Sequence, residues 1–370
     1  MNTSYLTVDA IELRKYVENL YQNYGFKQED CETVADVLLA ADLRGVDSHG
    51  VSRLAWYDEW IEKGLINLKP NIKITTETPT TANVDGDNGM GMLVSKFAMN
   101  LAIKKAKEYG TGLVSVGRSN HYGIAGYYSM MASKEDMVGI SMTNMIPIVA
   151  PTNGKQRMLG TNPISFAIPA KTEDPFVLDM ATTAVSGGKL EIAMREERDI
   201  PYGLAIDKEG RATNNPKDPW DNGALVPLGG DSCDTGGHKG YGLATLVNAL
   251  SGALSGSIYG INQSDSKLFG NPLSVVANVG HFFGAFKVEG FREKEEVLTT
   301  MDGMLRSLKE SEPAPGHERV YVAGEKEFES ERKRVKNGIP LHIKTIKELA
   351  MLGEKYNINY DFLPLNNVEV

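Results

Sequence analysis

The stretch DLRGVDSHGVSRL, residues 42–54, places a hydroxyl group, an imidazole and a guanidinium within six residues. It follows one helical pattern and precedes another, so Ser48 is predicted to cap the later helix. Arg53, four residues after His49, would then share a helical face with it near the positive end of the helix dipole. Such a cluster could bind a small carboxylate while an imidazole exchanges a proton. The alternative is that Ser48 is only a cap and Arg53 only a surface charge.

The segments on either side of this stretch have helical periodicity. Asp9 and Glu12 have the spacing of a capping box, and an apolar stripe follows them. Two further apolar stripes, over residues 34–41 and 54–61, have the spacing of buried helix faces. We therefore expect an N-terminal helical segment over residues 1–76.

After about residue 72 the pattern changes to short β-type runs separated by glycine, proline and asparagine. Strands are predicted at residues 72–75, 82–85, 112–116, 138–143, 164–168, 176–179 and 282–288. Helical patterns lie between them at residues 93–109, 124–133 and 185–195. The spacing is too irregular for a βαβ repeat, so we expect an α/β body, of the α+β kind, over residues 77–290.

Residues 240–264 contain no charged side chain, and a run of this length could span a membrane. Glycine, serine and threonine residues interrupt the run, so we expect a buried helix over residues 240–262 inside the central body. Residues 291–370 return to helical patterns. We expect this C-terminal segment to pack with the N-terminal one as a single helical domain.

Composition sets limits on the class of protein. A chain of 370 residues can form two or three domains, and 41% hydrophobic with 24% charged residues excludes disorder and coiled coil. The net charge of −9 is spread along the sequence, so we expect no nucleic-acid partner. The polar interruptions of the 240–264 run lead us to expect no membrane partner. Two distant cysteines and an N-terminus without a secretory pattern lead us to expect a reduced, cytoplasmic protein.

Several polar residues lie at strand ends or in glycine-rich loops. His121 is a second acid–base candidate, unless it only bonds its own loop. Asp179 could accept hydrogen bonds from a ribose or cap a helix. Thr161 could donate to a phosphate or an amide or serve only the turn, and Lys239 suits an anion. His281 is expected to be a core histidine. The sequence has no GxGxxG fingerprint, and its histidines form no HxxxH pair, so a metal-dependent hydrolase is the weaker alternative and no metal site is predicted.

The sequence motifs and their order along the chain resemble those of the type-2 malate/L-lactate dehydrogenase family, and the resemblance covers nearly the whole chain. The likeness rests on DLRGVDSHGVSRL at 42–54, RSNHYGIAGYY at 118–128, LGTNPI at 159–164, LDMATTAVSGGKLE at 178–191 and GGHKGYGLATLVNALSG at 236–252. It is strongest toward the malate dehydrogenases of the family. The resemblance implies a non-Rossmann fold with an irregular, mostly antiparallel sheet, a helical domain assembled from both chain ends, and a homodimer.

The resemblance also implies a reaction, which is hydride transfer between NAD or NADP and a 2-hydroxy acid. Malate is the first choice, and lactate, sulfolactate and ureidoglycolate are the alternatives. Arg53 would bind the substrate carboxylate, and Ser48 would orient His49. Either His49 or His121 would exchange the hydroxyl proton. Lys189 stands where imine reductases of the family carry an acid, which argues against imine reduction.

The cofactor would contact residues spread over much of the chain. By resemblance these are His121, Tyr122, Gly123, Ile124, Ala125, Met145, Thr161, Asp179, Met180, Ala181, Lys239, Pro313, Gly316 and Arg319.

Overall fold

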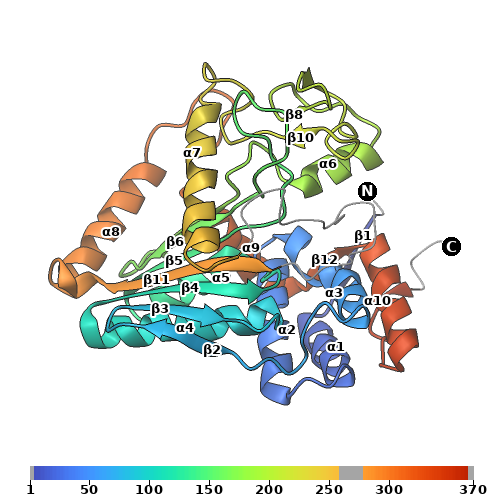
Figure 1. Cartoon of the computed structure of the whole chain (residues 1–370), viewed down its shortest axis with the longest axis horizontal. Helices are drawn as coiled ribbons and strands as arrows, with labels where there is room; N and C mark the ends of the chain where they lie inside the picture. The colour runs from blue at the N-terminus through green and yellow to red at the C-terminus, as the bar shows by residue number, and fades with distance from the viewer. Residues whose placement is uncertain (1–3, 258–277, 366–370) are drawn as a thin grey trace.

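The computed structural model describes residues 4–257 and 278–365, and a seven-stranded sheet forms its centre (Figure 1). The strand order is β2-β3-β4-β11-β5-β6-β7. Among the described strands of this sheet, only β3 and β4 pair in parallel. The predicted class, with a mostly antiparallel sheet, is confirmed, whereas a Rossmann sheet is mostly parallel. The bounds are Lys73–Glu77 (β2), Thr81–Asp85 (β3), Thr111–Ser119 (β4), Met137–Thr143 (β5), Ile164–Ile168 (β6), Phe176–Met180 (β7) and Val279–Lys287 (β11).

Helices cover both faces of this sheet. On one face, α4 (Gly91–Tyr109) and α5 (Ala125–Ser133) pack closely against the strands (Figure 1). A Cβ atom on Gly139 of β5 would lie 2.0 Å from the carbonyl oxygen of Ser129, so only glycine permits the observed approach of α5. On the other face, Val247 of α7 (Gly237–Val247) packs on the sheet, and the π-helical turn η3 (Asn248–Ala253) follows. The central strands are therefore buried on both sides.

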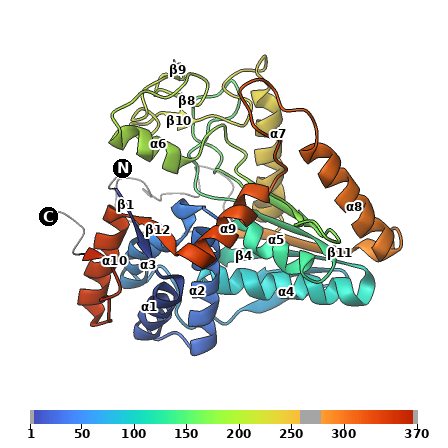
Figure 2. The same cartoon turned by 180° about the vertical axis from the view of Figure 1, so that it is seen from behind.

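The two ends of the described chain form one helical unit beside the sheet, as predicted (Figure 2). Tyr16 donates a 2.6 Å hydrogen bond to the carbonyl oxygen of Leu349, which joins the first helix to the last. Asp9 caps the first helix as predicted, accepting the N–H groups of Ile11 and Glu12. The unit comprises β1 (Tyr5–Val8) paired with β12 (Ile339–His342), together with α1 (Ala10–Asn23), α2 (Gln28–Leu43), α3 (Leu54–Glu62) and α10 (Ile343–Tyr356).

One C-terminal helix departs from the expected packing of residues 291–370. Whereas α9 (Glu325–Asn337) packs on α2, α8 (Lys294–Lys309) lies at the far end of the sheet from α10 (Figure 1). The buried carboxylate of Asp302 fixes α8 there by accepting backbone N–H groups of residues 171–173 at 2.9–3.2 Å. The domain boundaries near residues 76 and 290 stay a prediction.

The uncharged run predicted as a buried helix is in fact half exposed. On α7 only a stripe of small residues and Val247 is buried. The buried stripe contacts the rest of the molecule, whereas several apolar side chains beside it are exposed in the part of the chain that the structure describes. These are Tyr241 (37% exposed), Leu243 (37%), Leu246 (45%) and, after η3, Leu254 (59%). Residues 258–262 of the prediction lie outside the described residues. Across the described ranges no helix is both long and apolar enough for a membrane crossing.

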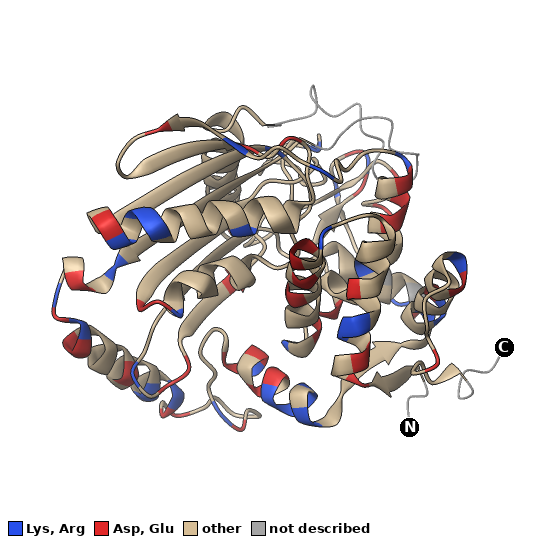
Figure 3. Cartoon of the chain, turned by 90° about the horizontal axis from the view of Figure 1, so that it is seen from below, with Lys and Arg blue, Asp and Glu red and all other residues tan. Residues whose placement is uncertain are grey.

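A second, small sheet was not expected from the sequence. It consists of β8 (Ala205–Ile206), β9 (Ala212–Thr213) and β10 (Ala224–Leu225), and it lies beside α6 (Gly187–Arg195) (Figure 1). Strands of two residues have no periodicity to recognise. On the face shown in Figure 3, acidic and basic residues are interspersed along the helices, in line with the spread of charge in the sequence.

Candidate active site

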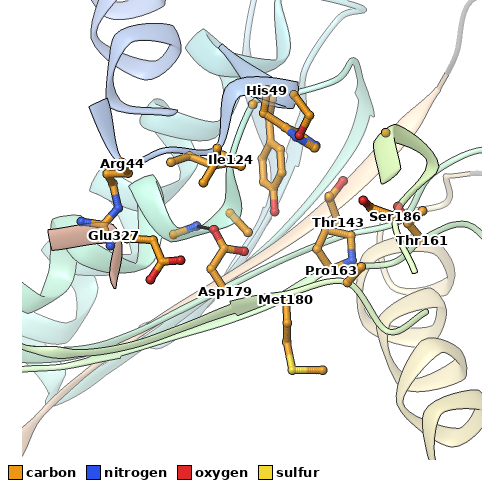
Figure 4. Close-up of a pocket in the computed structure, with 18 of the residues that line it drawn as sticks. Arg44, His49, Ile124, Thr143, Thr161, Pro163, Asp179, Met180, Ser186 and Glu327 are labelled. Atoms are coloured by element: carbon orange, nitrogen blue, oxygen red, sulfur yellow. Dashed lines mark hydrogen bonds between the residues drawn. The ribbon is translucent and has the colours of Figure 1, made fainter. Parts of the chain in front are cut away.

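One cavity lies where the helical unit meets the large sheet, and α6 and the start of α9 complete its walls (Figure 4). Its volume is about 540 Å³, within the range of small-molecule and cofactor sites. The stretch 42–54 contributes one wall through the short helical turns η1 (Asp47–His49) and η2 (Val51–Arg53). The loop before α5, the end of β7 and residues 186–188 contribute others.

The backbone of residues 47–53 forms two 3₁₀ turns instead of the predicted helix start. Gly50 separates them, and its ψ of −144° is not helical. A Cβ atom there would lie 1.9 Å from Oδ1 of the buried Asp42, so only glycine fits. The prediction that Ser48 caps α3 is therefore wrong, because its hydroxyl group bonds the imidazole of His49.

The two turns bring a hydroxyl, an imidazole and a guanidinium together. Oγ of Ser48 lies 2.8 Å from Nδ1 of His49, which fixes the orientation of the ring. Arg53 donates from Nε to the backbone carbonyl oxygen of Ser48. Its guanidinium also stacks on Trp56, with Cζ 3.8 Å from the centre of the ring. The predicted cluster therefore exists, although its geometry is that of turns and not of one helical face.

His121 joins this cluster from the loop between β4 and α5. Its ring and that of His49 are roughly parallel, with centres 5.5 Å apart and planes 29° apart. The hydroxyl group of Tyr57, on α3, lies 2.6 Å from Nδ1 of His121. Burial raises the pKa of Tyr57, so the phenol keeps its proton and can donate to this nitrogen.

Loss of water around the two imidazoles lowers their pKa values. The pKa of His49 falls to about 4, first through burial and then through the positive charge of Arg53. The pKa of His121 falls well below its usual value, first through burial and then through the electrostatic influence of His49 and Arg53. Both rings are therefore neutral at pH 7, each with one protonated and one unprotonated nitrogen.

The opposite end of the cavity carries the carboxylates of Asp179 and Glu327, with the guanidinium of Arg44 beside them (Figure 4). Asp179, at the end of β7, is exposed to the cavity and accepts the N–H of Gly126 at 2.6 Å. Loss of water within the cavity raises the pKa of this carboxyl group to about 6, although the bond from Gly126 and the charge of Arg44 lower it. Glu327 of α9 raises it further. At pH 7 Asp179 is mostly ionised and accepts hydrogen bonds strongly.

His281 lies on β11 behind the cavity wall and is fully buried, as predicted for a core histidine. Its two ring nitrogens each lie 2.8 Å from a hydroxyl group, those of Thr143 and Ser119. Its ring is parallel to that of Tyr122, with centres 4.6 Å apart. Burial lowers the pKa of His281 to about 3, so a neutral ring supports Thr143 and Tyr122 at the cavity wall.

Comparison with known proteins identifies the family. The family model described as malate/L-lactate dehydrogenase matches residues 8–350. The chain belongs to the malate/L-lactate dehydrogenase family. The malate dehydrogenase of Pyrococcus horikoshii is 44% identical over 358 residues, which cover 97% of this chain and 98% of the relative. The L-sulfolactate dehydrogenase of Methanocaldococcus jannaschii is 39% identical, over 94% of this chain and 96% of the relative.

Solved structures agree with this assignment. A malate dehydrogenase from Entamoeba histolytica has a TM-score of 0.91 at 37% identity, over 96% of this chain and 99% of its own. The malate dehydrogenase structure from Pyrococcus horikoshii has a TM-score of 0.88 at 42% identity, over 96% of this chain and 97% of its own. As a member of the malate/L-lactate dehydrogenase family, the chain is an oxidoreductase.

Membership of this dehydrogenase family implies a nicotinamide cofactor, and the cavity fits a dinucleotide. Asp179 offers a carboxylate acceptor for ribose hydroxyl groups. Gly187 and Gly188 form the start of α6 at the cavity wall, where Ser186 makes no side-chain capping bond. Backbone N–H groups at a helix start bind phosphate, and glycine permits its close approach.

Most predicted site residues line this cavity. They are Ser48, His49, Arg53, His121, Tyr122, Gly123, Ile124, Ala125, Met145, Thr161, Asp179, Met180 and Ala181. Four others do not line it in the described chain. Lys239 is exposed on α7, and Pro313, Gly316 and Arg319 lie between α8 and α9, where Arg319 pairs with Glu329 at 2.6 Å. Their contact with the cofactor stays a prediction.

Several residues at the site have no role predicted from the sequence. Trp56 and Tyr57 follow Arg53 by three and four residues, so helical spacing alone could have placed them beside it. Arg44, Thr143 and Glu327 had no such signal, because elements distant in sequence bring them to the cavity.

Proposed function

We propose that this dehydrogenase interconverts malate and oxaloacetate with NAD or NADP. The observation that carries the proposal is the presence of Arg53, His49 and His121 on one part of the cavity wall. A 2-hydroxy acid presents a carboxylate on the carbon next to its hydroxyl group, so it needs a cation and a proton acceptor side by side. The names of the relatives at 44% and 45% identity, both malate dehydrogenases, support malate as the substrate.

Arg53 binds the substrate carboxylate in this proposal. A guanidinium is planar and can donate two parallel N–H groups to one carboxylate, which fixes the orientation of the substrate as well as its position. The bond from Arg53 to the carbonyl oxygen of Ser48 holds the side chain next to His49. The hydroxyl-bearing carbon of the substrate is thereby directed to the imidazoles.

A neutral imidazole exchanges the hydroxyl proton. His49 takes the proton at Nε2 during malate oxidation, with its Nδ1–H donating to Oγ of Ser48. His121 accepts the hydroxyl hydrogen of Tyr57 at Nδ1, so its neutral ring carries a hydrogen on Nε2 and donates it to the substrate oxygen. The nicotinamide ring supplies the hydride acceptor in this direction and the hydride donor in the other. In oxaloacetate reduction Nε2 of His49 returns its proton to the oxygen, and Arg53 stabilises the negative charge that develops there.

Other 2-hydroxy acids are the second candidates. L-sulfolactate and ureidoglycolate dehydrogenases are among the relatives, at 39% and 32–33% identity. Sulfolactate, like malate, has a second anionic group, whereas lactate has a methyl group. Nothing favours the metal-dependent hydrolase, because the described residues contain no group of three His, Cys, Asp or Glu side chains suited to a metal ion.

A steady-state screen of 2-oxo acids tests the proposal. We expect oxaloacetate to oxidise NADH or NADPH with the highest kcat/KM in a set that includes pyruvate and sulfopyruvate. The absorbance of the reduced cofactor is the measurement, and using both cofactors decides between NAD and NADP. A higher kcat/KM with sulfopyruvate or pyruvate would transfer the assignment to that acid. No turnover of any 2-oxo acid would contradict the proposal.

We also propose that the enzyme acts as a homodimer in the cytoplasm. The exposed apolar side chains on α7 and after η3 support a contact with a second copy, because such neighbouring apolar groups gain stability when covered. Sedimentation equilibrium should give a dimer mass. Leu246→Glu, which places a charge in the middle of this surface, should shift the protein toward the monomer, and Met304→Glu on α8 is the control. A monomer mass for the unmodified chain would contradict the proposal.

A further inference from the structure

We propose that Trp56 is a positioning residue whose indole ring holds the guanidinium of Arg53 in the orientation that binds the substrate carboxylate. The inference rests on the proposed function, in which Arg53 binds that carboxylate. It assigns to Trp56 a role in the affinity for the 2-oxo acid, distinct from the affinity for the cofactor.

The geometry of the pair carries the inference. Trp56 lies in the first turn of α3, three residues after Arg53, where helical spacing places side chains next to each other. Cζ of Arg53 is 3.8 Å from the centre of the indole, well inside the limit of about 6 Å for attraction between a cation and an aromatic ring. Both side chains line the cavity.

Stacking is compatible with carboxylate binding. The N–H groups of a guanidinium lie in its plane, so a ring that covers one face leaves the direction of those N–H bonds unobstructed. A second contact fixes rotation within the plane, since Nε of Arg53 donates to the carbonyl oxygen of Ser48. The ring and the carbonyl oxygen together define both the plane and the direction of the guanidinium.

Arginine needs such support at this position. Its side chain has many rotamers, and a substrate that must first order it loses binding free energy. The indole also removes water from one face of the charge, which strengthens the attraction to a carboxylate. Trp56 is 38% exposed, so it contributes less to the core than a buried tryptophan does, and its removal tests the stack more than the fold.

The test measures KM and kcat of Trp56→Ala and Trp56→Phe with oxaloacetate and the preferred reduced dinucleotide. We expect Trp56→Ala to raise KM for oxaloacetate about tenfold, with kcat changed less than about twofold and KM for the dinucleotide unchanged. Trp56→Phe, which keeps an aromatic face, should recover most of the affinity. The control is Glu59→Ala, an exposed residue of the same helix, which should leave every constant unchanged.

A double-mutant cycle adds a second criterion. Arg53→Lys keeps the charge but lacks the flat guanidinium, so adding Trp56→Ala to it should raise KM far less than Trp56→Ala does alone. Additive effects, a fall in kcat equal to the rise in KM, or no rescue by phenylalanine would each overturn the inference. If the unmodified protein turns over oxaloacetate and KM is insensitive to Trp56, only this inference fails. If it turns over no 2-oxo acid, the proposed function fails.

Discussion

The two ends of the cavity have opposite chemistry but respond to burial by the same rule. At one end, loss of water lowers the pKa values of His49 and His121, and at the other it raises the pKa of Asp179 to about 6. In each case the neutral form is favoured, because the charged form loses its hydration. At pH 7 the outcomes differ, since the imidazoles are neutral and Asp179 is still mostly ionised. The histidine end is therefore suited to proton exchange, and the acidic end to holding hydroxyl groups.

The largest expected effect is the fall in kcat when the proton-exchanging histidine is replaced, and it shows which of the two imidazoles has that role. Replacing the one that exchanges the proton by glutamine should lower kcat for oxaloacetate reduction by about 10²–10⁴-fold, because general acid–base catalysis is lost. Replacement of the other histidine should lower kcat about tenfold or less. Kinetics of His49→Gln and His121→Gln measure this difference. His238→Gln, an exposed histidine on α7, is the control. Losses below tenfold in both variants would contradict the assignment of the histidine end.

Removal of Arg53, the cation at the histidine end, should have the next largest effect. Arg53→Ala should lower kcat/KM for 2-oxo acids at least about a hundredfold, since a carboxylate bound away from water would lose its charge partner. Arg292→Ala, which removes an exposed arginine from a surface ion pair, is the matched control and should have no effect. Near-normal kcat/KM in Arg53→Ala would show that the substrate carboxylate binds elsewhere.

The acidic end should respond to pH where the histidines do not. As pH falls through about 6, Asp179 gains a proton and becomes a weaker acceptor for ribose hydroxyl groups, so KM for the dinucleotide should rise. Asp179→Asn should raise KM about tenfold at pH 7.5 and abolish the pH dependence between 5 and 7. Asp174→Asn, outside the cavity on the segment before β7, is the control. The same pH dependence in Asp179→Asn would assign it to another group.

The smallest effect concerns the group that orients His121. Tyr57→Phe removes the hydroxyl group that bonds Nδ1 and should lower kcat about three- to tenfold, with KM for the dinucleotide unchanged. Tyr24→Phe is the matched control, because its hydroxyl group bonds Asp58 instead of a residue of the cavity wall. An unchanged kcat in Tyr57→Phe would mean that packing alone orients the imidazole.

Local patterns predicted the elements of the fold well. The short β-type runs at 164–168 and 176–179 became β6 and β7, and Asp9 caps α1 as its spacing indicated. Predictions failed where packing between elements, and not periodicity, decides the backbone or the burial. Asp42, eight residues before Gly50, packs against it where two 3₁₀ turns replace the start of the expected helix, and α7 lacks a cover on its apolar side within the described chain.

At the site, the sequence by itself determined the residue types, the glycine at position 50 and the helical spacing that places Trp56 and Tyr57 beside Arg53. Only the tertiary structure decided that His49 and His121, far apart in the chain, lie with ring centres 5.5 Å apart, and that Asp179 lies at the other end of the same cavity. The physical reason is that propensity and periodicity act over a few residues, whereas loss of hydration and the field of neighbouring charges depend on every element packed around a group.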